Sequence, residues 1–106
     1  MVIIVFSNGT EWFKANWVFR QLAEDVATAF PLDQEVNFEI EKAQAIGALF
    51  LKDMDEPLRL RVTERLRTVA QRTLDGEIDG WRRDDADGHR MYLESLSELL
   101  ALINAQ

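Results

Sequence analysis

The start of the chain decides the fold, and it allows two interpretations. Residues 2–14 read Val-Ile-Ile-Val-Phe-Ser-Asn-Gly-Thr-Glu-Trp-Phe-Lys. Val2–Phe6 is β-branched and aromatic throughout, which predicts a strand. The Asn8-Gly9 pair is typical of a type I′ turn, which would pair this strand with Glu11–Lys14 in a hairpin. Alternatively, Asn8 or Thr10 caps a helix. The helical periodicity that follows almost at once favours the cap.

Apolar residues at spacings of three and four predict four amphipathic helices, at about residues 12–30, 34–54, 57–74 and 88–104. Pro31 ends the first helix, because proline disfavours the helical conformation of the residue before it. Asp33 is the expected cap of the second helix. Helices with short connections pack economically as a bundle. The sequence thus predicts a mainly α, four-helix bundle-like single domain over residues 1–106. It has a short N-terminal strand at 2–6, a possible hairpin at 2–14 and an acidic loop at 75–87.

Composition excludes several classes of protein. The chain of 106 residues has 12 basic and 19 acidic side chains, a net charge of −7, one histidine and no cysteine. It therefore lacks the means for a disulfide scaffold, a thiol nucleophile or an iron–sulfur cluster. The negative charge argues against binding nucleic acid, which needs a basic surface. No apolar run approaches the ~20 residues of a membrane-spanning helix. We therefore expect a cytoplasmic protein that binds neither membranes nor nucleic acid.

Catalytic and metal-binding motifs are incomplete in this sequence. No serine lies in a Gly-x-Ser-x-Gly elbow, and no glycine-rich phosphate loop is present. Two windows resemble calcium-binding loops, but each lacks a ligand that the loop requires. Asp75–Ala86 has alanine in place of the closing glutamate, and Arg83–Glu94 begins with arginine in place of aspartate. We therefore expect no catalytic residues, no metal and no cofactor, and we do not expect an enzyme.

Aromatic placement is the most informative feature for function. On a helical wheel, Phe13 and Trp17 lie more than about 100° from the expected core stripe, in line with Arg20. Phe38 and Leu49 form a second stripe on the next predicted helix. A helix that is apolar on two sides is either central or shared with another chain. The backbone groups of the strand at 2–6 also need a hydrogen-bonding partner, and the same strand of a second, two-fold related copy of the chain could supply it.

These observations predict a non-enzymatic protein-interaction or regulatory module that acts as a homodimer and that could also bind a second protein. The expected partner-binding residues are Phe13, Trp17, Arg20, Phe38 and Leu49. Internal burial of the same faces under the strand and the last helix stays open as an alternative.

The alternative function is a small-molecule-binding bundle with an aromatic pocket. Its walls would be Trp12, Phe13, Trp17 and Trp81, and Arg61 or Arg65 would fix an acidic group of the ligand. With Arg72, these two arginines form a basic stripe on one side of the third predicted helix. The stripe could instead pair with acidic residues of the second helix, and the net charge favours that pairing.

Overall fold

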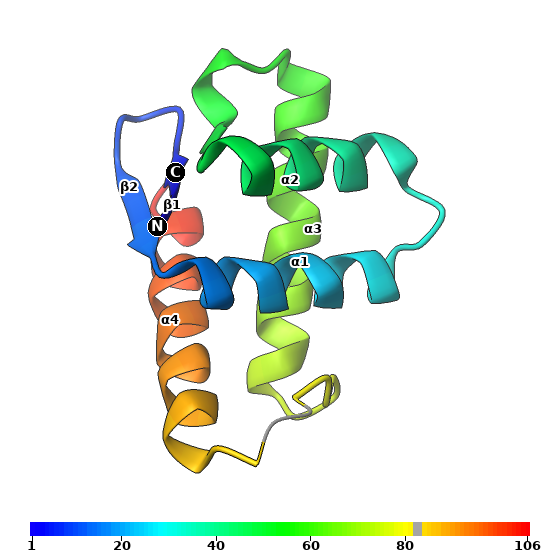
Figure 1. Cartoon of the computed structure of the whole chain (residues 1–106). Coiled ribbons are helices and arrows are strands. Elements are labelled where there is room, and N and C mark those ends of the chain that lie inside the picture. Colours follow the sequence, from blue (N-terminus) through cyan, green and yellow to red (C-terminus); the bar gives the residue numbers. More distant parts are fainter. Residues whose placement is uncertain (82–83) are drawn as a thin grey trace.

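A computed structural model describes residues 1–81 and 84–106, which form a small sheet and a set of α-helices (Figure 1). In chain order the elements are β1 (Val2–Val5), β2 (Glu11–Lys14), α1 (Asn16–Ala29), α2 (Gln34–Ile46), β3 (Ala48–Phe50), the 3₁₀ turn η1 (Leu51–Asp53), α3 (Glu56–Leu74) and α4 (Ala86–Asn104). The prediction of a mainly helical protein is confirmed.

The start of the chain is a hairpin, so the helix cap that the sequence favoured is wrong. β1 and β2 pair antiparallel, with Ile4 opposite Trp12. The Phe6 N–H donates to the Thr10 carbonyl at 2.9 Å, and the Gly9 N–H donates to the Phe6 carbonyl at 3.0 Å. Gly9 has a φ of +88°, which suits the left-handed residue of a three-residue hairpin loop. The first helix therefore begins at Asn16 rather than at residue 12.

The second predicted helix ends eight residues early, and its last part joins the sheet. Gly47 caps α2 in the left-handed conformation, with its N–H bonded to the Ala43 carbonyl. The chain then runs as β3, parallel to β1, with Leu49 opposite Ile4. The strand order is β2-β1-β3, so the strands are not confined to the N-terminus. A parallel pair needs a long crossover connection, and α1 and α2 supply it.

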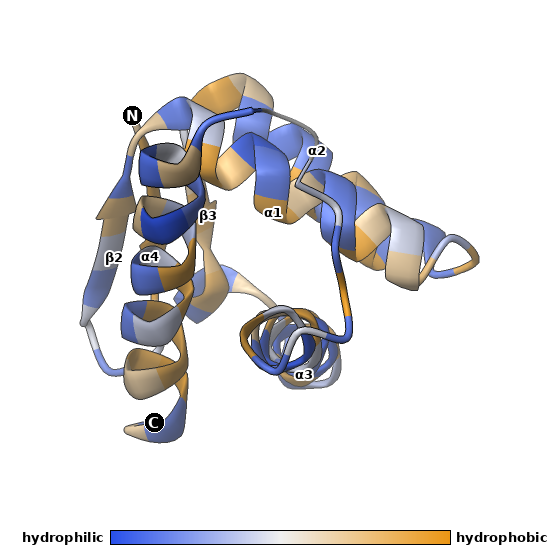
Figure 2. Ribbon diagram, turned by 90° about the horizontal axis from the view of Figure 1, so that it is seen from below, coloured by the Kyte–Doolittle hydropathy of each residue, from blue (hydrophilic) through white to orange (hydrophobic). Residues whose placement is uncertain are grey.

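The structure does not confirm the four-helix bundle. In Figure 1, α1 and α2 lie one above the other across α3, whereas α4 stands at one side with the strands. Figure 2 shows α3 end-on, below α1 and α2. One hydrophobic core joins all of these elements through buried residues that include Trp12, Phe19, Ile40, Leu66 and Leu96. None of the described helices is both long enough and apolar enough to cross a membrane.

Candidate functional site

The two faces of the sheet have opposite environments. Ile4, Trp12 and Leu49 lie side by side across the three strands, and each is at most 2% exposed. The Trp12 indole also donates a hydrogen bond from Nε1 to the Ser95 carbonyl of α4, at 2.9 Å. An indole N–H that is buried needs such a partner, and this one fastens β2 to α4. This face of the sheet belongs to the core.

The outer face of the sheet is apolar and open. Its large apolar members are Ile3 and Val5 of β1, Phe13 of β2 and Phe50 of β3, because residues directly opposite one another share a face. Ala48, opposite Ile3, and Glu11, opposite Val5, lie on the same face. Phe13 is 55% exposed and Phe50 is 42% exposed, whereas on the central strand Ile3 is half-buried and Val5 is buried. We call these four residues the open sheet face. Contiguous exposed apolar side chains of this kind are typical of interaction surfaces.

β2 is an edge strand whose outward backbone groups follow from the pairing pattern. Phe6 and Thr10 form a hydrogen-bonded pair. Because such pairs alternate along an antiparallel ladder, the backbone N–H and C=O of Glu11 and Phe13 point away from β1. Strand order places β2 at the end of the sheet. The open sheet face thus continues into an edge that can hydrogen-bond to a further strand.

The predicted partner-binding residues do not form one surface. Phe13 lies on β2, so it does not extend the Trp17 side of a helix. Trp17 is half-buried in α1, and its ring contacts Trp81 edge-on with centroids 6.0 Å apart. Arg20 is exposed on α1. Phe38 is 61% exposed on α2, with the Lys42 ammonium 5.6 Å from its ring centroid.

Leu49 is the one predicted partner-binding residue that the chain itself buries. The helical stripe on which it was placed stops at Ile46, because Gly47 ends α2. Phe50 was not predicted at a partner-binding surface for the same reason, because the second predicted helix extends over β3. The run Ala48-Leu49-Phe50-Leu51 directly after a glycine was the available signal.

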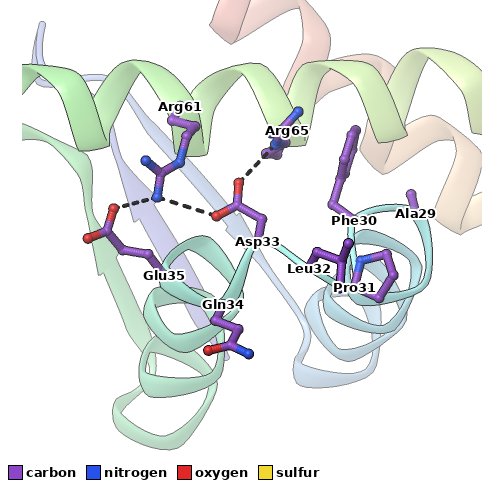
Figure 3. A pocket seen from close by; sticks show the side chains of 9 residues that line it. All are labelled: Ala29, Phe30, Pro31, Leu32, Asp33, Gln34, Glu35, Arg61 and Arg65. Carbon is purple, nitrogen blue, oxygen red and sulfur yellow. Dashed lines mark hydrogen bonds and ion pairs between the residues drawn. The ribbon is translucent and has the colours of Figure 1, made fainter.

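Arg61 and Arg65 do line a cavity, of about 740 Å³, where the α1–α2 connection meets α3 (Figure 3). Both arginines are occupied there by carboxylates. Arg65 Nε donates to Asp33 Oδ2 at 3.0 Å, and Arg61 contacts Asp33 Oδ1 at 3.3 Å and also Glu35. The Arg65 guanidinium lies 4.2 Å from the Phe30 ring centroid. These contacts clamp the connection onto α3, so an acidic ligand would have to displace Asp33 or Glu35.

Asp33 also caps α2, by accepting a hydrogen bond from the Val36 N–H at 3.3 Å. Desolvation opposes ionisation of this carboxyl. The hydrogen bonds from Arg65 and Val36, together with the charges of Arg61 and Arg65, outweigh that effect and hold the pKa of Asp33 below its usual range. The corner is therefore a structural ion-pair network.

The residues of the alternative ligand pocket lie in different places. Trp12 is in the core, and Arg61 and Arg65 are at the cavity beside Phe30. Trp81 instead packs against α1 and α4: it stacks on His89 at 5.3 Å and on Tyr92 at 5.8 Å between centroids. The structure does not bring the predicted aromatic walls and the arginine anchors together.

A buried carboxylate links α1 to α4. Asp25 accepts hydrogen bonds from the Tyr92 hydroxyl at 2.8 Å and from Gln21 Nε2 at 3.1 Å. Burial raises the pKa of Asp25, against the effect of these hydrogen bonds, and burial beside the Asp25 charge raises the pKa of Tyr92. A Cβ at Gly80 would come within 2.4 Å of Asp25 Oδ1, so the connection after α3 requires glycine there.

Residues 1–81 and 84–106 contain no group of three or more His, Cys, Asp or Glu side chains that could hold a metal ion. Arg83, the first residue of the second calcium-like window, lies outside the described residues. Comparison of the chain with protein-family models, with curated proteins and with solved structures found no match in any of the three. The open sheet face and its edge are therefore the candidate functional site on geometry alone.

Proposed function

We propose that this protein is a non-enzymatic interaction module that acts as a homodimer through the open sheet face and the β2 edge. The observation that carries the proposal is the continuity of the two features at Phe13. Its side chain is 55% exposed on the apolar face, and its backbone points out from the edge strand.

A second copy of the chain fits this edge by symmetry. A two-fold axis perpendicular to the sheet and passing beside Phe13 would pair β2 antiparallel with β2 of the second copy. Such an axis keeps both open faces on the same side, because residues opposite each other share a face. Phe13 would then exchange backbone hydrogen bonds with its own equivalent, and the two phenyl rings would lie side by side. The result is one continuous sheet with a joined apolar face.

The non-enzymatic part of the proposal is supported by the way the buried polar groups are satisfied. Asp25 bonds to Tyr92 and Gln21, as described above. The hydroxyls of Thr73 and Ser95 donate to backbone carbonyls of their own helices, at 2.7 and 2.8 Å. Hydrogen bonds of this kind stabilise the fold, and we infer that these groups serve the structure rather than a substrate.

Sedimentation equilibrium of the full chain tests the dimer, with Phe13→Glu as the decisive variant. We expect the unaltered chain to dimerise and Phe13→Glu to be monomeric, because the charge would be buried in the joined face. Phe38→Glu is the matched control: it removes an equally exposed phenylalanine from α2, away from the sheet, and should dimerise normally. A monomeric unaltered chain, or a Phe38→Glu chain that is impaired while Phe13→Glu is not, would reject the proposal.

A further inference from the structure

The arginines of α3 differ in how their charge is neutralised. Arg61 and Arg65 pair with Asp33 and Glu35 at one end of the helix, and Arg67 pairs with Glu64 one turn before it. Arg72, near the other end, forms no ion pair with any residue in ranges 1–81 and 84–106, and its side chain is exposed. Arg59 has no carboxylate partner among the described residues either, but its Nη1 donates to the Met54 carbonyl at 3.4 Å.

Arg72 borders a cavity of about 280 Å³ between α3 and α4. The lining residues are Arg67, Thr68, Gln71 and Arg72 of α3 and Leu100 and Asn104 of α4. Every polar residue in this set carries N–H or O–H donors, and none is acidic. The cavity at Arg61 and Arg65 is different, because Asp33 and Glu35 are part of its wall.

Arg67 adds a second observation within the same cavity. Its Nη1 bonds to Glu64, but its Nε is buried and has no hydrogen-bond partner among the described residues. A buried donor without an acceptor costs folding free energy.

We propose that this cavity binds the phosphate group of a small phosphorylated molecule. Arg72 supplies a charge that no described carboxylate neutralises, and Arg67, although it pairs with Glu64, adds a second guanidinium with N–H donors that suit phosphate oxygens. Thr68, Gln71 and Asn104 supply neutral donors around them, and Leu100 contacts the apolar part of the molecule. The site lies on α3 and α4 and does not involve the open sheet face, so phosphate binding there does not depend on the proposed dimer.

Titration of the isotope-labelled full chain with inorganic phosphate, followed by NMR at constant ionic strength, tests the site. We expect saturable shifts at the side-chain amides of Gln71 and Asn104. Arg72→Gln should weaken phosphate binding at least tenfold, because one of the two charged contacts is lost. Its exposed position predicts an otherwise unchanged spectrum.

Arg59→Gln is the matched control. It makes the same change of charge on the same helix, at an arginine whose only side-chain hydrogen bond among the described residues is to the Met54 carbonyl, and it should leave phosphate binding unaltered. Shifts that do not saturate, or equal weakening by Arg59→Gln and Arg72→Gln, would reject the site in favour of general charge attraction. Saturation by acetate at the same residues and with the same affinity would overturn the assignment to phosphate.

Discussion

Trp12 and Phe13 are neighbours in the chain, yet they have opposite environments. Trp12 is 1% exposed and hydrogen-bonded to α4, whereas Phe13 is 55% exposed on the other side of the same strand. The same contrast is repeated in β3 between Leu49 and Phe50. Both residues of each pair are aromatic or aliphatic, so residue type does not distinguish the two faces of the sheet. The difference shows that the helices cover one face of the sheet and leave an apolar face open.

The largest expected effect is the loss of stability when Trp12, on the covered face of the sheet, is replaced. Trp12→Ala should lower the free energy of unfolding by about 4 kcal/mol, since it removes a buried ring together with its hydrogen bond to the Ser95 carbonyl. Urea unfolding of the dilute chain measures it. Phe13→Ala is the matched change on the open face and should cost less than about 1 kcal/mol. Equal losses for the two variants would show that the open face is internally covered.

The second contrast is in β3. Leu49→Ala should cost about 3 kcal/mol, because the residue is 2% exposed and packs beside Ile4. Phe50→Ala, one residue further on, should cost only about 0.2–1 kcal/mol, the size of a cross-strand pair contact. Thermal unfolding of both variants at one low concentration provides the measurement. A larger loss for Phe50→Ala than for Leu49→Ala would reverse the assignment of the two faces.

The smallest effect concerns the charged residues at the two ends of β2. Lys14 pairs with Glu98 of α4 on the covered face, and Glu11 is exposed on the open face. Lys14→Ala should cost at most about 1 kcal/mol, because the Glu98 partner is largely solvated. The loss should shrink at high salt, which screens the pair. Glu11→Ala should show no such salt dependence in urea unfolding. A loss at Lys14 that salt does not reduce would indicate packing of its aliphatic stem instead of charge.

Local patterns predicted much of the fold. The third and fourth helices begin and end within about two residues of their predicted bounds, and Asp33 caps α2 as expected. The three arginines of the basic stripe behave differently. Arg61 and Arg65 pair with acidic residues at the start of α2, which is the pairing that the net charge favoured, whereas Arg72 does not. These outcomes depend on residues a few positions apart, which is the range that periodicity and capping describe.

The candidate site was only partly predictable. Phe13 was identified from the sequence, but within a helix that in fact begins only at Asn16, and Phe50 was assigned to the core stripe of the second predicted helix. The apolar positions Val36, Ile40, Ala43, Gly47 and Phe50 keep a helical spacing through the end of α2. Periodicity therefore does not mark the point at which Gly47 turns the chain into a strand.

The sequence by itself determined the helical content and the acidic balance of this protein, because each depends on local conformation or on composition, whereas it left the hairpin at 2–14 as an alternative to a helix cap. Tertiary structure decided the rest. A strand as short as Ala48–Phe50 exists only where β1 offers its backbone N–H and C=O groups. Whether Trp12 or Phe13 is buried depends on which side of the sheet α4 packs against, because successive side chains of a strand point to opposite faces. That choice is made by residues more than eighty positions away, such as Ser95.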